Sequence, residues 1–211
     1  MRRDPGDGTI EVEPSRYSTL RLFQRLFMAD DRERWNTKFL GGEAQLVDPD
    51  PFLIDVCADL RPGSALDLAG GAGRHSIWLA RHGWRVTLSD VSDEGIALAR
   101  KRCGEAAVHV DLRRESLAET IAWASGSGIH FNLITIFWFL AREAFDALPT
   151  LLAPGGLLVY KTYTAENARF ENGKSTQYAL RPDELRTAFP ALQTVLYREA
   201  EGVSELAARA H

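Results

Sequence analysis

The chain has 211 residues, of which 45% are hydrophobic, and these values suit a single domain with a sizeable core. Its formal net charge of -4 disfavours a non-specific grip on phosphate backbones, because nucleic-acid binders usually carry a basic surplus. We therefore expect a small-molecule partner and no nucleic acid. Composition alone leaves the oligomeric state open.

The two cysteines, Cys57 and Cys103, lie far apart in the sequence and inside predicted helices. This spacing favours buried, reduced thiols over a disulfide framework or a metal cluster, so no metal site is expected. No stretch approaches the roughly 18 apolar residues that a membrane span requires, and no apolar run follows Arg2 and Arg3. The default expectation is a cytoplasmic location without a membrane partner.

The N-terminal part of the chain predicts helices in front of the main domain. Apolar residues recur there at helical spacing, at Leu20, Phe23, Leu26 and Phe27. A second short helix is expected to carry Trp35 and Phe39. We predict that residues 1–49 form a flexible leader and a helical lid, and that residues 50–211 form the main domain.

Beyond this preface, apolar runs alternate with helical stretches, which is typical of a parallel sheet wrapped by helices. Asp50 followed by Pro51 predicts the start of the first helix, because Asp is a common N-cap and Pro suits the first turn. The predicted strands are 64–69, 84–89, 106–110, 130–137 and 156–163. The predicted helices between them are 74–82, 92–103, 114–124 and 141–151.

The end of the chain has a different pattern. After a predicted helix at 182–189, residues 191–199 and 203–210 are predicted as two strands, and Glu201-Gly202 between them suits a hairpin turn. The fold class is therefore α/β, with a doubly wound, mostly parallel sheet of seven strands, a C-terminal antiparallel hairpin and an N-terminal helical preface.

A glycine-rich turn follows the first predicted strand, in the stretch SALDLAGGAGRHS that runs from Ser64 to Ser76. A strand, a glycine turn, a helix N-terminus and a carboxylate closing the next strand, here Asp90, form the geometry that grips a ribose. The sequence thus predicts a nucleoside-bearing cofactor. Asp67 precedes the glycines, and its carboxylate would repel a pyrophosphate but favour a cationic amino group.

These motifs, in this order, resemble those of the class I S-adenosylmethionine-dependent methyltransferases. The resemblance covers nearly the whole span from Asp50 to the C-terminus and rests on Asp67 to Gly73, Asp90, Asp111 and the turn Leu152 to Gly156. It implies a Rossmann-like fold. More narrowly, the stretch GRHSIWLARHGWRVTLSDVS looks like the branch of small bacterial methyltransferases related to tellurite-resistance and thiopurine methyltransferases.

Two residues depart from the pattern of the family. Ala69 stands where the first motif usually has glycine, and Asn132 stands where the fourth strand usually begins with Phe-Asp. An alanine is tolerable in this tight turn if its φ is negative, and Asn132 falls at the entry of its strand, away from the expected site.

The resemblance implies S-adenosylmethionine as the cofactor and S-adenosylhomocysteine as the product. The residues expected at the cofactor are Trp35, Asp67, Ala69, Gly70, Gly71, Gly73, His75, Asp90, Val91, Asp111, Leu112 and Phe137. Asp90 would bind the ribose hydroxyls, although it could instead cap the helix that starts at Ser92. Asp111 would close the third strand near the adenine amino group, and Trp35 would act as a lid.

The resemblance also implies methyl transfer by in-line displacement to a small-molecule nucleophile: a thiol, a chalcogen oxyanion or a compact metabolite. Because the leaving group is already activated, alignment and exclusion of water suffice, and no catalytic residue is assigned. The candidates on the acceptor side are Trp138, Tyr163, Lys161 and Glu166.

Two alternatives remain. An NAD-dependent oxidoreductase would use the same glycines for a dinucleotide, although the carboxylate of Asp67 argues against it. A non-catalytic S-adenosylmethionine-binding protein would keep the same pocket as a sensor or scaffold, because binding residues and turnover residues are different sets.

Overall fold

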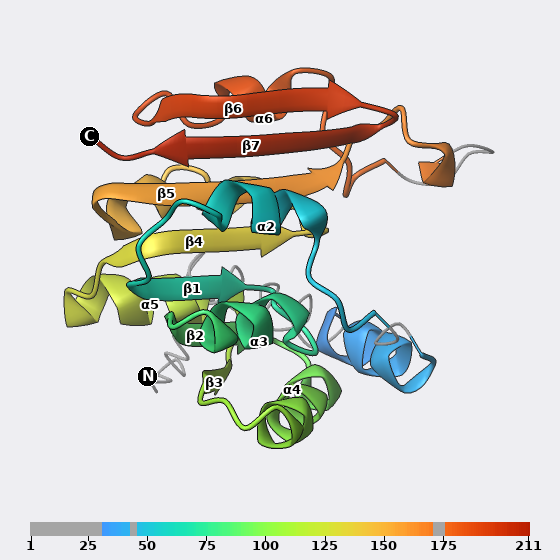
Figure 1. Cartoon of the computed structure of the whole chain (residues 1–211). Helices are drawn as coiled ribbons and strands as arrows, with labels where there is room; N and C mark the ends of the chain where they lie inside the picture. The colour runs from blue at the N-terminus through green and yellow to red at the C-terminus, as the bar shows by residue number, and fades with distance from the viewer. Residues whose placement is uncertain (1–30, 43–45, 171–175) are drawn as a thin grey trace, which may run out of the picture.

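The computed structural model describes residues 31–42, 46–170 and 176–211, and its centre is a sheet of seven strands (Figure 1). The strand order is β3-β2-β1-β4-β5-β7-β6, in which β1 to β5 run parallel and β7 runs antiparallel to both β5 and β6. The order reverses between β1 and β4, which is where open α/β sheets hold their ligands, beyond the carboxyl ends of the strands. The predicted fold class is confirmed.

The strands in chain order are β1 (Ser64–Leu68), β2 (Arg85–Asp90), β3 (Asp111–Arg114), β4 (Phe131–Phe137), β5 (Leu152–Tyr163), β6 (Gln193–Ala200) and β7 (Val203–Arg209). Central strands such as β1 and β4 are buried over almost their full length. Both faces of a parallel sheet are covered by helices, which suits the mainly apolar sequences of these strands.

The helices are a segment at 31–40, α2 (Pro51–Cys57), α3 (Arg74–Arg81), α4 (Asp93–Glu105), α5 (Leu117–Ser127) and α6 (Glu184–Thr187). The predicted start of α2 is confirmed, because the Asp50 carboxylate accepts a hydrogen bond from the Phe52 amide at 3.1 Å. A capping box of Ser116 and Glu119 begins α5 in the same way, so side chains satisfy amides that the helix leaves unpaired.

Two hydrophobic cores lie on opposite faces of the sheet. One contains α2, α3 and α4 and includes Leu53, Leu79 and Ile96. The other contains α5, α6 and the turns before β5, and its centre is Tyr160, which is fully buried. Cys57 and Cys103 are free thiols buried in the first core, as predicted.

The hairpin at the C-terminal end forms as predicted. Glu201 and Gly202 both have positive φ, at 53° and 70°. Two successive residues in that region fit the type I′ turn, whose twist matches the flanking strands β6 and β7.

Two predicted elements were wrong. Residues 141–151 form the short 3₁₀ turns Arg142–Ala144 and Leu148–Leu151 instead of one helix, because Pro149 has no amide hydrogen and disfavours helical backbone before it. The predicted strand 106–110 is a turn instead. The preceding helix α4 continues to Glu105, and the chain uses Ala106 to Val110 to return to the sheet.

Candidate functional site

A cavity of about 750 Å³ lies at the carboxyl ends of the central strands. The last residues of β1, β2, β4 and β5 all line it: Leu68, Asp90, Phe137 and Tyr163, in that order. This volume is within the range of small-molecule and cofactor sites. The cavity is lined by most of the residues predicted for the cofactor: Trp35, Asp67, Ala69, Gly70, Gly71, Gly73, His75, Asp90, Val91 and Phe137.

The turn after β1 uses three residues with left-handed backbone. Gly71 and Gly73 have φ of 53° and 80°, which glycine adopts without strain. Ala69 has φ of 54°, so the negative φ that would make alanine easily tolerated in this turn is not present. An L-residue in this region costs about 1 kcal/mol or more, and such strain tends to lie at functional sites.

Asp67 holds this turn from below. Its carboxylate is 1% exposed and accepts hydrogen bonds from the hydroxyls of Ser76 at 2.6 Å and Thr135 at 2.8 Å. Burial raises its pKa, against the opposing effect of these two hydrogen bonds. A Cβ at Gly70 would lie 2.8 Å from the Asp67 carboxylate, so only glycine fits directly above it.

Asp90 links the glycine turn to the next helix. One carboxylate oxygen accepts the Gly71 amide at 2.9 Å, and the other accepts the Ser92 amide at 2.8 Å. The N-cap of α4 is Ser92, whose hydroxyl accepts the Gly95 amide, so Asp90 is not the capping residue. Burial raises the pKa of Asp90 to about 6, the largest effect on this group.

The N-terminal helical segment lies over the same turn. In Figure 1 it occupies the end of the sheet to which the arrows of β1 and β4 point. The ring of Phe39 packs on both Gly71 and Gly95, where an added Cβ would come within 2.8 Å and 2.9 Å of it. The expected helix around Trp35 and Phe39 is confirmed, while the one predicted from Leu20 to Phe27 lies outside the described residues.

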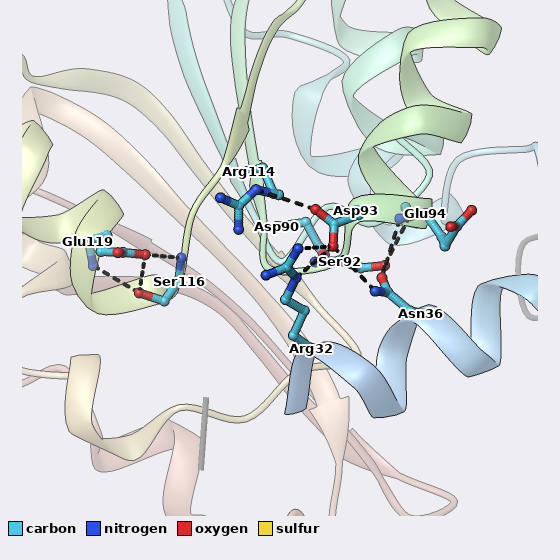
Figure 2. Close-up of polar contacts among 10 residues, drawn as sticks. Arg32, Asn36, Asp90, Ser92, Asp93, Glu94, Arg114, Ser116 and Glu119 are labelled. Carbon is cyan, nitrogen blue, oxygen red and sulfur yellow. Dashed lines mark hydrogen bonds and ion pairs between the residues drawn. The ribbon is translucent and has the colours of Figure 1, made fainter. Parts of the chain in front are cut away.

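Polar contacts fix this helical segment to the N-terminus of α4, as Figure 2 shows. The Asn36 side-chain oxygen accepts the Ser92 hydroxyl at 2.7 Å and the Glu94 amide at 3.3 Å, and its amide group donates to Asp93 at 3.3 Å. Arg32 pairs with the same carboxylate of Asp93 at 2.6 Å. The helical segment is therefore held directly beside the cavity.

We expect Asn36→Ala to loosen this segment, because it removes hydrogen bonds that together contribute about 1 to 2 kcal/mol. Hydrogen exchange of amides 36–41 should accelerate by about fivefold or more. Arg32→Gln is the control, since it removes only an exposed ion pair, which contributes about 1 kcal/mol at most. Equal protection in Asn36→Ala and the parent protein would show that these contacts do not hold the helix.

The acceptor-side candidates Trp138 and Tyr163 line the cavity together, with ring centroids 4.6 Å apart. Trp138 has φ of 61°, and its amide donates to the Lys161 carbonyl at 2.8 Å. A positive φ is a rare backbone conformation for a bulky residue, and it persists only where contacts with the surrounding structure stabilise it. The strained Trp138 thus forms a fixed wall of the cavity.

His75 also lines the cavity, and its ring contacts that of Phe137 at a tilt of 38°, with centroids 4.2 Å apart. Its side chain is buried, and its Nε2 atom has no hydrogen-bond partner. Burial lowers its pKa well below 6.5, and the charges of Arg74 and Lys161 lower it further. His75 is therefore neutral near pH 7.

Two predicted acceptor-side residues do not line the cavity. Lys161 donates to the carboxylates of Asp50 at 2.8 Å and Glu205 at 2.9 Å. Burial alone would lower its pKa, but these two partners outweigh burial and raise it, so Lys161 stays a cation and is no base. Glu166 is exposed. No hydrogen bond among the described residues joins its side chain to a residue of the cavity.

Two predicted cofactor residues are misplaced as well. Asp111 begins β3 instead of closing it, and the register pairs it with Thr87, while Arg114 lies level with Asp90. Neither Asp111 nor Leu112 lines the cavity. Glu115 and Leu117, which follow the strand, line the cavity instead.

Sequence reasoning missed several cavity residues: Arg34, Lys38, Phe39, Asp50, Arg74, Arg102, Glu115, Arg169, Phe170 and Tyr178. The sequence predicts Asp50 as a helix N-cap but carries no signal that places it at the cavity. Arg169, Phe170 and Tyr178 belong to the segment after β5. The sequence of this segment shows no helical or strand periodicity, so it does not predict where these side chains lie.

Comparison with known proteins identifies the central part of the chain. Residues 65–156 match a protein family described as a methyltransferase domain. The chain is 34% identical over 122 residues to a ubiquinone biosynthesis O-methyltransferase of Xanthomonas axonopodis pv. citri (strain 306), a match that covers 54% of this chain and 50% of the relative. The chain thus spans about half the length of the curated relatives it matches.

Solved structures share the fold at lower identity. TehB from Haemophilus influenzae superposes with a TM-score of 0.67 at 17% identity, covering 80% of this chain and 64% of TehB. The N-methyltransferase NodS from Bradyrhizobium japonicum WM9, solved in complex with S-adenosyl-L-homocysteine, superposes with a TM-score of 0.64 at 20% identity, covering 85% of this chain and 97% of NodS.

No helix in the described part of the chain is both long and apolar enough to cross a membrane. Within the same residues, no three His, Cys, Asp or Glu side chains are grouped to hold a metal ion. The expected cytoplasmic location and the expected lack of a metal stay predictions.

Proposed function

We propose that the chain is a class I, S-adenosylmethionine-dependent methyltransferase that transfers a methyl group to a small-molecule nucleophile, as the match of residues 65–156 to a methyltransferase domain supports. The observation that carries this proposal is the Asp90 carboxylate beside the glycine turn, at the switch point of the sheet. In this proposal the helical segment at 31–40, which belongs to the lid expected within residues 1–49, covers the site, and residues 50–211 form the methyltransferase domain.

The described residues suit this cofactor. When bound, S-adenosylmethionine supplies a methyl group on a sulfonium. Asp90 would bind its ribose hydroxyls, Glu115 its adenine and Asp67 its amino group, since all three residues line the cavity. Arg74, at the start of α3, meets its carboxylate.

The acceptor approaches from the side of β4 and β5, beside the paired rings of Trp138 and Tyr163. Rings beside a sulfonium stabilise its charge by roughly 0.5 to 2 kcal/mol. Otherwise the chain's contribution is alignment and exclusion of water. The O-methyltransferase name of the curated relatives supports a hydroxyl acceptor, whereas the resemblance to the tellurite-resistance branch supports a thiol or a chalcogen oxyanion.

Calorimetric titration of the purified protein with S-adenosylmethionine, S-adenosylhomocysteine and NAD tests the proposal. We expect binding of the first two compounds and none of NAD. Binding of NAD alone would favour the oxidoreductase alternative. Methyl transfer is then measured with thiols, selenite, tellurite and phenols. Cofactor binding without transfer to any of them would favour a non-catalytic binding protein.

A further inference from the structure

The cavity is lined by both carboxylates and cations. The carboxylates have close partners among the described residues, whereas some of the cations form no ion pair there. Four carboxylates line it, and each is already engaged. Asp50 pairs with Lys161, and Asp67 accepts two hydroxyls. Asp90 accepts two amides, and Glu115 pairs with Arg113 at 2.6 Å. None of these four carboxylates forms an ion pair with Arg169, and each makes its close contacts with other groups.

Several cations of the same wall lack such partners. Arg169, Lys38 and Arg74 form no ion pair with a carboxylate of the described residues. Arg74 donates a hydrogen bond to the Asp48 carbonyl. In the proposed function, Arg74 also binds the carboxylate of the cofactor. Lys38 belongs to the helical segment that covers the glycine turn. Arg169 remains as the cation on the acceptor side.

Arg169 is held against an aromatic ring. Its guanidinium carbon lies 4.0 Å from the centroid of the Tyr163 ring. A guanidinium stacked on a ring keeps its N–H groups directed outward in the plane, where they can bind a carboxylate with two parallel hydrogen bonds. Stacking thus positions Arg169 and leaves its donors available.

The walls beside Arg169 are flat and apolar. Trp138 and Tyr163 stack on each other, and Phe170 contacts Tyr163 edge-on at 6.3 Å between centroids. Tyr178 also lines the cavity, with Arg34 over its ring at 4.8 Å. Aromatic side chains of this kind favour stacking with a planar molecule.

From these two features we infer that the acceptor is a planar, aromatic anion whose carboxylate or equivalent acidic group binds Arg169. The ring of the acceptor lies against Trp138 and Tyr163. This inference rests on the proposed function, because it names the substrate class of the same site. It predicts discrimination by charge, which neither a neutral thiol nor an uncharged phenol would require.

The test uses 4-hydroxybenzoate as the anionic probe, 4-hydroxybenzamide as its neutral counterpart and selenite as a small anion without a ring. Each is titrated by calorimetry into the full chain, with and without saturating S-adenosylhomocysteine. We expect 4-hydroxybenzoate to bind at least about tenfold more tightly than the other two. Equal binding of the amide, or tighter binding of selenite, would overturn the inference.

Substitutions of Arg169 test whether this residue binds the acidic group of the acceptor. Arg169→Gln should weaken 4-hydroxybenzoate binding by about tenfold and leave the amide and S-adenosylhomocysteine unaffected. Arg169→Lys should restore part of the affinity as a point charge. Arg85→Gln is the matched control, because Arg85 is exposed at the amino end of β2, at the opposite edge of the sheet. Unchanged binding in Arg169→Gln would contradict the inference.

The two proposals fail separately. Loss of S-adenosylhomocysteine binding would refute the proposed function, whereas the titrations without it still report on the anion site. Methyl transfer to neutral acceptors alone would keep the proposed function and overturn the inference.

Discussion

Asp90→Ala is expected to weaken the binding of S-adenosylmethionine by about 1 to 3 kcal/mol, because it leaves the ribose hydroxyls without their acceptor. The same change frees the amides of Gly71 and Ser92, which now donate to the carboxylate. Calorimetry measures the affinity, with circular dichroism to confirm folding. Asp59→Ala, at an exposed position, is the control. Unchanged affinity in a folded Asp90→Ala protein would remove Asp90 from the site.

The parent protein should show a pH dependence that follows from the pKa of Asp90. Burial raises that pKa to about 6 in the folded chain, above its ordinary value near 3.8. The contribution of Asp90 to stability is therefore complete below about pH 4 and is lost as the pH rises through 6. Hydroxyl binding favours the ionised form, so cofactor affinity should rise over the same interval. Asp90→Asn should flatten both profiles; identical profiles in the two proteins would assign them to another group.

Lys161→Met is expected to lower the free energy of unfolding by about 3 kcal/mol, because removing one partner of a buried ion pair leaves uncompensated charge. The carboxylates of Asp50 and Glu205 are 5% and 4% exposed, and both accept from this ammonium group. Arg198 still pairs with Glu205, so Asp50 bears most of the loss. Urea unfolding followed by circular dichroism measures the change.

Two variants control this experiment. Lys101→Met removes an exposed pair with Glu105, at 3.8 Å, and should change stability by about 0.5 kcal/mol or less. Lys161→Arg keeps the charge and should retain most of the stability if Lys161→Met fails to fold. A loss below about 1 kcal/mol in a folded Lys161→Met protein would mean that the cluster contributes little.

The parts of the site that follow from local pattern were predictable from the sequence. Asp67, the glycine turn and Asp90 each stand at the end of an apolar strand, and parallel strands bring those ends to one edge. Asp111 shows the limit of that reasoning. Its position depends on where α4 ends, and helix boundaries are less well determined by sequence than helix existence.

The rest depended on contacts between distant segments. The sequence predicts Lys161 on the acceptor side, but its ion pairs with Asp50 and Glu205 determine what it does. Asp50 precedes β1 in the chain, and Glu205 lies in β7. Phe39 was placed on a helix, yet the sequence could not indicate that its ring meets Gly71 and Gly95. The strain at Ala69 likewise follows from the geometry of the turn, which residue type alone does not fix.

The position of β7 has a consequence for how the chain acquires this structure. β7 follows β6 in the sequence but lies between β5 and β6 in the sheet, and it supplies Leu206 and Ala208 to one core and Ala207 to the other. During synthesis on the ribosome, β5 consequently emerges with an open edge and a lysine whose acidic partner on β7 has not yet been made. Such edges and long-range pairings slow folding and invite aggregation. Closure of the sheet is thus a late event, delayed until β7 has been translated.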